Sequence, residues 1–259
     1  MFAPAPELKV LKKMNYISDQ EGIIRRFLRE QNGWQSHLSR TSSFILSVLE
    51  KHETNHIVVL GSGWLLDFPL ENILSLVQKI DLVDVYFPAQ ILKKAAKYSK
   101  VECIKADITG GYIQSVYDQL RNTDKVFKIP EIKPDNPIFP KQGKLVISLN
   151  ILNQLDILLI DYICSKIVME TEQIQSLRQI LQESHINLLQ EHSFILISDY
   201  KELLINRRGD VLEEKELIFT RFPQGKIVEE WDWFFDSHQL YNSRGNTVMK
   251  VKAVYSKGS

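Results

Sequence analysis

The residues with the clearest chemical potential begin with two glycines that interrupt an apolar run. Residues 57–60 are all apolar, and the sequence Gly61-Ser62-Gly63 follows them directly. Glycines let a ligand approach the backbone closely, and the free N–H groups of such a turn can bind a polar group. The pattern predicts a nucleotide-like ligand where a buried strand turns toward a helix. A purely structural turn is the alternative.

A carboxylate at a second strand end strengthens this prediction. Asp84 lies near the end of the predicted strand 80–85, 23 residues after Gly61. A carboxylate at about this spacing can accept hydrogen bonds from the two hydroxyls of a ribose. Val85 follows it and is expected to border the same ligand. The alternative is that Asp84 only caps the next helix.

Two more polar side chains follow predicted strands. Asp107 comes after residues 101–105, where it could accept a hydrogen bond from the amine of adenine while Ile108 covers the ring. Its alternative role is that of an ordinary turn residue. Asn150 follows residues 144–149 and could orient a reacting heteroatom without itself acting as a base. Alternatively, Asn150 or Asn153 is a helix N-cap.

Three other residues are weaker candidates for the same edge of the sheet. His37 lies on a predicted helix that precedes the first strand, and we name it beside Asn150 as a possible catalytic residue. A solvated helix position is its alternative. Asp199 and Tyr200 follow the fifth predicted strand and could contact a substrate. None of the six histidines has metal-ligand spacing to another ligand, so the sequence predicts no metal site.

The elements that must position these residues alternate between strands and helices. This alternation predicts an α/β fold with a Rossmann-like, doubly wound sheet of seven strands, mainly parallel, closing with an antiparallel C-terminal hairpin. The five parallel strands are expected at 57–60, 80–85, 101–105, 144–149 and 194–198. The hairpin is expected at 227–235 and 247–255, and residues 217–221 are also strand-like. In the aromatic run 231–235, alternate rings are expected to pack in the core.

Two helices are expected before the first strand. The spacing of Ser18 and Glu21 is that of a capping box, which predicts a helix ending near Gly33, and a second helix begins near Ser36. Later helices are expected at 69–79, from Pro88 onward, and at 113–120, 152–168 and 171–190. We expect a single domain over 1–259, with a helical cap at 1–54, a core at 55–259 and a Pro-rich insertion at about 122–142.

Composition narrows the classes of partner. Lys plus Arg and Asp plus Glu both number 32, so no net charge favours nucleic acid or an anionic membrane. Cys103 and Cys164 lie in predicted core segments and are expected to be reduced, buried thiols. The N-terminus does not resemble a signal peptide, and no apolar run is long enough to span a membrane. A cytoplasmic protein is expected.

The motifs together resemble a known superfamily. Leu60-Gly61-Ser62-Gly63, then Val83-Asp84-Val85 before a Pro-started helix, then Lys105-Ala106-Asp107 and the polar Asn150 occur in one order along the chain. This order resembles class I S-adenosylmethionine-dependent methyltransferases over about residues 35–255. The closing strands are similar to the antiparallel seventh strand of that superfamily. Residues 61–70 and 148–155 look like those of an uncharacterised bacterial methyltransferase-like group, which brings no substrate with it.

The resemblance implies S-adenosylmethionine as the small-molecule cofactor and an unidentified methyl acceptor. It implies that the glycines face the methionine part, Asp84 holds the ribose hydroxyls, Asp107 holds the adenine amine and Asn150 lies beside the methyl group. The residues implied to line the cofactor are Gly61, Ser62, Gly63, Asp84, Val85, Asp107, Ile108 and Asn150.

The chain departs from the pattern of the superfamily at two positions. Val59 stands where members usually carry an acid, and Leu65 stands where the third glycine falls. A catalytically silent binding protein with the same fold is therefore an alternative. An NAD-dependent oxidoreductase ranks lower, because its fingerprint needs a third glycine at the position of Leu66.

Overall fold

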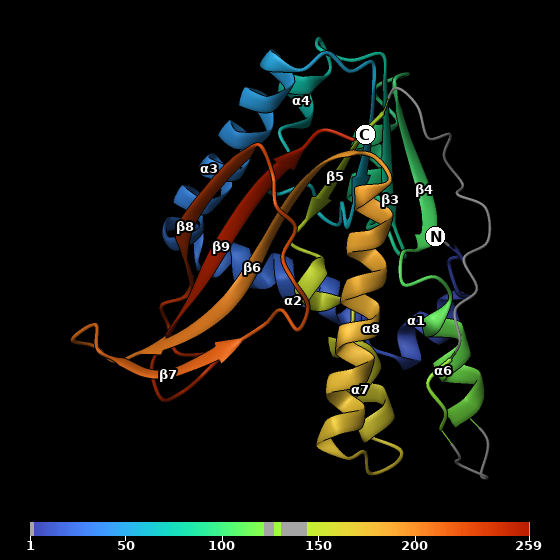
Figure 1. The fold of residues 1–259 in the computed structure, drawn as a ribbon, viewed down its shortest axis with the longest axis vertical. Coiled ribbons are helices and arrows are strands. Elements are labelled where there is room, and N and C mark those ends of the chain that lie inside the picture. The colour runs from blue at the N-terminus through green and yellow to red at the C-terminus, as the bar shows by residue number, and fades with distance from the viewer. Residues whose placement is uncertain (1–2, 122–126, 131–143, 259) are drawn as a thin grey trace.

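The computed structural model describes residues 3–121, 127–130 and 144–258 (Figure 1). The described strands are β1 (Ala3–Pro4), β2 (His56–Leu60), β3 (Lys79–Asp84), β4 (Val101–Asp107), β5 (Lys144–Leu149), β6 (Ser193–Ile205), β7 (Val211–Glu216), β8 (Ile227–Asp236) and β9 (Asn246–Ser256). The described helices are α1 (Leu8–Lys13), α2 (Tyr16–Arg29), α3 (Gln31–Lys51), α4 (Leu70–Ile73), α5 (Ala89–Ala95), α6 (Tyr112–Leu120), the 3-10 helix η1 (Leu152–Gln154), α7 (Ile157–Cys164) and α8 (Thr171–Gln190).

The strands form one mixed sheet with the order β1-β4-β3-β2-β5-β6-β9-β8, and β7 pairs with β6. The neighbours from β4 to β6 are parallel, whereas β9 runs antiparallel to both β6 and β8. The predicted α/β fold with a mostly parallel sheet and an antiparallel hairpin is confirmed. The predicted number of seven strands is wrong, because the described chain adds β1 at one edge and β7 beside β6.

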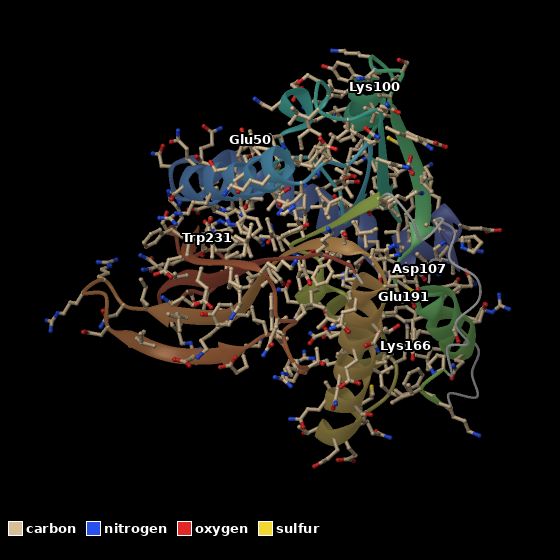
Figure 2. All side chains as sticks on the ribbon, turned by 45° about the horizontal axis from the view of Figure 1, so that its top comes forward. Glu50, Lys100, Asp107, Lys166, Glu191 and Trp231 are labelled. Carbon is tan, nitrogen blue, oxygen red and sulfur yellow. The ribbon has the colours of Figure 1, made fainter. Side chains whose placement is uncertain are left out.

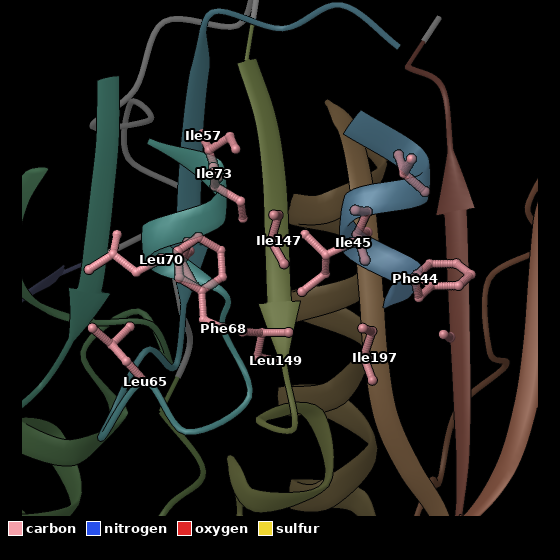
Figure 3. Close-up of a cluster of buried hydrophobic side chains, with 14 of the residues drawn as sticks. Phe44, Ile45, Ile57, Leu65, Phe68, Leu70, Ile73, Ile147, Leu149 and Ile197 are labelled. Carbon is pink, nitrogen blue, oxygen red and sulfur yellow. The ribbon is translucent and has the colours of Figure 1, made fainter. Parts of the chain in front are cut away.

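Both faces of the central strands are covered by helices, which explains their continuous apolar sequences. Ile57 and Val59 of β2 belong to the buried cluster that includes α3, and Val58 and Leu60 belong to the cluster that includes α6, α7 and α8. Figure 3 shows Phe44 of α3 among the side chains of the first cluster. Figure 1 shows α3 lying along β8 and β9, so this helix also covers the hairpin.

The order of the strands reverses between β2 and β5. From β2 the chain proceeds outward to β3 and β4, and it then returns to place β5 and β6 on the other side of β2. In open α/β sheets, ligands bind at such a switch point, beyond the carboxyl ends of the strands. Helix α2 lies over this end, where the Trp64 Nε1–H donates a hydrogen bond of 2.7 Å to the Gln20 carbonyl. The topology therefore predicts a ligand site at the turn after β2.

The N-terminal helices differ from their prediction. The capping box at Ser18 and Glu21 is wrong, because α2 already begins at Tyr16, after Asn15 in the left-handed region. Gly33 does not end a helix but lies inside α3. A Cβ atom at this position would come within 2.6 Å of the Phe234 carbonyl oxygen, so glycine permits close contact between α3 and β8.

Several predicted bounds also change. The helix predicted at 69–79 covers only Leu70–Ile73, and the one predicted at 152–168 divides into η1 and α7. The strand predicted at 217–221 is absent from the described chain; β7 ends at Glu216, where its pairing with β6 ends. The Pro-rich insertion at 122–142 lies mostly outside the described residues.

The two thiols are free, but their predicted burial is wrong. Cys103 is half-buried, and Cys164 is exposed. Cys164 is the last residue of α7, whose buried side consists of Leu159, Ile160 and Ile163. Among the described residues, no helix combines the length and the apolar character that a membrane span requires.

Candidate functional site

The turn after β2 contains three alternate residues in the left-handed region of the backbone. Their φ angles are 72° at Gly61, 41° at Gly63 and 53° at Leu65. A Cβ atom at Gly61 would lie 2.9 Å from the Cβ of Ile151, so a side chain does not fit there. Leu65 keeps a conformation that favours glycine although it carries a buried side chain. The turn therefore has the backbone of a three-glycine turn with one leucine in it.

Asp84 is bonded to this turn. Its Oδ2 accepts a hydrogen bond of 2.8 Å from the Gly63 N–H, and its Oδ1 accepts one of 3.3 Å from the Tyr86 N–H. Burial raises the pKa of the Asp84 carboxyl to about 6. With the further backbone bond from Val85, the carboxylate still retains capacity for another donor. Val85, the next residue, is half-buried.

Asp107 is placed differently. Its Oδ1 accepts hydrogen bonds from the N–H and the hydroxyl of Thr109, at 2.9 and 2.6 Å. Its Oδ2 accepts from the N–H groups of Gly111 and Ile113, at 3.2 and 3.4 Å. These four donors occupy the acceptor capacity of the carboxylate, as expected of a turn residue. Figure 2 shows Asp107 at the end of β4, and the half-buried Ile108 follows it.

The two catalytic candidates, Asn150 and His37, come together. The Asn150 Nδ2 lies 3.3 Å from the His37 Nε2 and donates a hydrogen bond of 2.7 Å to the Asp67 Oδ2. Asn150 has a φ of 47°, a strained conformation of the kind that gathers at functional sites. No side-chain cap bond is present at η1, so the N-cap alternative for Asn150 is not observed.

His37 is an interior residue, so its alternative as a solvated helix position is wrong. It is 1% exposed, and its ring stacks on Trp233 with 4.0 Å between the ring centroids. The Trp231 Nε1–H donates to the His37 Nδ1 at 3.1 Å. Burial lowers the pKa of His37 to about 3, so the imidazole is neutral at pH 7 and carries its proton on Nε2. Figure 2 shows Trp231 on the side of the sheet near α3, which confirms that alternate rings of this run pack inward.

A second polar pair lies beside Asn150. The Asn153 Nδ2 donates a hydrogen bond of 2.8 Å to the Asp199 Oδ2. The Asn150 N–H donates to the Ile197 carbonyl at 2.8 Å, which holds the middle of β6 next to Asn150. Tyr200 lies apart from this pair, because its hydroxyl bonds to Glu230 at the surface.

Five buried polar atoms near these strand ends have no hydrogen-bond partner within the described chain. They are Gln20 Oε1, Ser62 Oγ, Asn150 Oδ1, Asn153 Oδ1 and Asp199 Oδ1. Gln20 belongs to α2, and its Oε1 lies 3.4 Å from the place that a Cβ of Gly63 would occupy. Buried polar atoms are normally paired, so these five acceptors at one edge of the sheet suit a polar ligand under α2.

The same edge has an excess of buried negative charge. Among the described residues, no ion pair is formed by Asp67, Asp84 or Asp199, and burial raises the pKa of each carboxyl. A buried, unpaired carboxylate is unfavourable. A positively charged ligand would relieve this cost, so the site favours cations.

Sequence reasoning missed Asp67 and the pairing of Asn153 with Asp199. Asp67 had a usable signal, because it is an isolated acid between the apolar Leu66 and Phe68. Its distance of 83 residues from Asn150 made the contact invisible in the sequence.

A separate hollow lies between α2 and α3. Its volume is about 560 Å³, and its lining includes Phe27, Gln35 and Leu38. The lining residues carry amide, hydroxyl and apolar groups but no titratable one. The chemistry is therefore assigned to the strand ends.

Comparisons with known proteins give distant similarities. No protein-family model and no curated protein matches the sequence. Among solved structures, the chain is similar to the N-methyltransferase NodS from Bradyrhizobium japonicum WM9 in complex with S-adenosyl-L-homocysteine, with 11% identity and a TM-score of 0.40 over 88% of this chain and 87% of that one. It is also similar to a DhpI–SAH complex, with 9% identity and a TM-score of 0.31 over 95% and 97% of the two chains.

Proposed function

We propose that this chain is an S-adenosylmethionine-dependent methyltransferase of class I that acts on an unidentified acceptor. The observation that carries the proposal is the glycine turn at the switch point of the sheet, with Asp84 bonded to Gly63. When bound, S-adenosylmethionine supplies a methyl group on a positively charged sulfur. The residues of this chain would bind the cofactor, orient the acceptor and exclude water.

The residues at the turn fit this cofactor. The left-handed turn at Gly61 and Gly63 would lie against the methionine part, and the hydroxyl of Ser62 is without a partner within the described chain. Asp84 retains acceptor capacity beside its backbone hydrogen bonds, which suits a ribose hydroxyl. The net positive charge of the cofactor suits the unpaired carboxylates.

The other predicted ligand residues have more particular roles in the proposal. Asp107 has no acceptor site left for the adenine amine, so we assign it to shaping the loop that places Ile108 and Val85 beside the ring. Asn150 would lie at the methyl end, with Asp67 fixing its carboxamide and His37 packed beside it.

The two alternatives differ in what supports them. A silent binding protein is suggested by Val59 and Leu65, but the left-handed φ of Leu65 supports an intact turn. A dinucleotide enzyme needs the N-terminus of a long helix directly after the glycines to bind the pyrophosphate. Here α4 begins only at Leu70 and has four residues, which disfavours the oxidoreductase.

Calorimetric titration with S-adenosylmethionine and S-adenosylhomocysteine tests the proposal. We expect both to bind, and we expect Asp84→Asn to weaken binding about tenfold or more, because the ribose loses a charge-assisted hydrogen bond. Asp118→Asn is the matched control, since Asp118 lies on α6 and bonds to Gln114 and Arg121 at the surface. Thermal unfolding verifies that each variant is folded.

Each other result would argue against the methyltransferase. Failure of both ligands to bind at millimolar concentration would refute the proposed cofactor. Tighter binding of NADH would support the oxidoreductase. Binding of both ligands without transfer of labelled methyl to any component of a cell extract would favour a silent binding protein.

A further inference from the structure

The pair of Asn153 and Asp199 has two unsatisfied acceptors at the ligand edge. Asp199 is 4% exposed and Asn153 is 7% exposed, and a single hydrogen bond of 2.8 Å joins them. The Oδ1 atoms of both side chains are buried without a partner in the described chain. Both are oxygens, so a matching ligand must donate more than one hydrogen bond here.

The groups around Asp199 do not neutralise it. Glu202 of the same strand adds a like charge, and Tyr241 lies near both carboxylates. The nearby cation, Arg26 of α2, has its guanidinium 4.6 Å from the centre of the Phe235 ring and forms no described ion pair with Asp199. A positively charged donor from a ligand would therefore satisfy the charge and the orphan acceptors together.

The inference rests on the proposed function and names the class of acceptor. We propose that the methyl acceptor is an amine and that Asp199, oriented by Asn153, accepts the proton which the amine loses. The nitrogen lone pair forms the new bond to the methyl carbon, and the bond between carbon and sulfur breaks with its electron pair going to sulfur. If the amine binds as an ammonium, it passes one N–H proton to the Oδ1 of Asp199 before the attack, which frees the lone pair; the methylated nitrogen then carries the positive charge that the sulfur loses, so atoms and charges balance.

The acidity of Asp199 suits this role. Burial raises the pKa of its carboxyl to about 7. A proton acceptor works best when its pKa is near the working pH, because it is then partly ionised and still basic. The short contact with Asn153 fixes which oxygen remains free for the ligand.

Sinefungin provides a direct probe. It resembles S-adenosylhomocysteine but carries an amine on the carbon that replaces sulfur, so its ammonium occupies the methyl-transfer position. We expect the wild-type protein to bind sinefungin about tenfold more tightly than S-adenosylhomocysteine, which is typical of one charged hydrogen bond. Asp199→Asn should abolish this preference while S-adenosylhomocysteine still binds. Glu202→Gln, which removes a neighbouring charge without touching the pair, should retain most of it.

The wild-type protein gives a second measurement that needs no substitution. The preference for sinefungin should rise between about pH 5.5 and about pH 8, as the Asp199 carboxyl ionises, and Asp199→Asn should show no such rise. Equal binding of both ligands at every pH, with S-adenosylhomocysteine bound well, would overturn the role of Asp199 and leave the methyltransferase intact. Failure of both ligands to bind would instead overturn the proposed function, and this inference with it.

Discussion

Leu65 combines a buried side chain with a backbone conformation that costs energy for any residue except glycine. Its φ is 53°, and it is 6% exposed. Both Leu65→Gly and Leu65→Ala lose packing, about 2–5 kcal/mol for a typical buried leucine. Only glycine relieves the backbone strain, which is about 1 kcal/mol. We therefore expect Leu65→Ala to be the less stable of the two in chemical unfolding.

A second leucine provides the control for this order. Leu70 is fully buried at the start of α4, where the backbone is helical. There alanine should be more stable than glycine by roughly 0.5–1 kcal/mol. If Leu65→Ala were likewise more stable than Leu65→Gly, the backbone at Leu65 would be free of strain in solution.

At the scale of residues, the sequence predicts where strands end, but it does not predict which side chains from distant segments come into contact. Asp84 and Asn150 are recognisable because each lies at the end of a mainly apolar strand, and such strands show where a buried segment stops. The bond between Asn150 and Asp67 joins two loops that are 83 residues apart, with three strands between them, and depends on how the whole sheet folds. The hydrogen bonds that fill the acceptor positions of the Asp107 carboxylate likewise depend on the turn at Thr109. The spacing of residues in the sequence does not predict this turn.

At the scale of elements, two glycines in neighbouring helices predict opposite effects of the same substitution. A Cβ atom on Gly33 of α3 would lie 2.6 Å from the Phe234 carbonyl oxygen, whereas a Cβ atom on Gly22 of α2 would have nothing within 4 Å. Gly22→Ala should stabilise the protein by up to about 1 kcal/mol through helix propensity. Gly33→Ala should destabilise it by about 1–3 kcal/mol, because α3 or β8 must move.

Thermal and urea unfolding of the two variants measures this difference. Each serves as the control for the other, since both substitutions add one methyl group to a helix. A stabilising Gly33→Ala would mean that α3 does not pack on β8 as closely as the structure indicates.

The predictability of the elements follows their burial. The sequence predicts β5 at residues 144–149, and the strand is observed at Lys144–Leu149, because an apolar run between two other strands leaves no other assignment. β6 is predicted to end at residue 198 but continues to Ile205. Its distal half contains charged residues and is held by pairing with β7, as in the ion pair of 3.0 Å between Lys201 and Glu216. Strands that pair at the surface in this way lack the continuous apolar run by which a buried strand is predicted from the sequence.

At the scale of the whole molecule, the raised carboxyl pKa values make stability depend on pH. A carboxyl whose pKa is higher in the folded state contributes stability that is fully present below its unfolded value of about 4. That contribution is lost as the pH rises through the folded value, about 6 for Asp84 and Asp156 and about 7 for Asp199. Burial lowers the pKa of His37 and His185, to about 3 and 4, so both oppose this trend below a pH of about 6.5.

A comparison with Asp199→Asn isolates one of these groups. Between about pH 5 and about pH 8, the free energy of unfolding of the ligand-free protein should fall relative to that of the variant, by at most about 1.4 kcal/mol per pH unit. Urea unfolding at several pH values measures the difference. Parallel curves for the two proteins would mean that Asp199 titrates in the folded state as it does in the unfolded chain.

The contacts between α3 and β8 also bear on how the chain is made in the cell. The Trp34 indole donates to the Phe235 carbonyl across 201 residues, and the Glu30 carboxylate accepts from Ser237 across 207. His37 likewise bonds to Trp231, 194 residues later. The residues of α2 and α3 are therefore synthesised well before these partners in and after β8. Since contacts between distant residues form slowly, these amphipathic helices depend on chaperones or on their own solubility during translation.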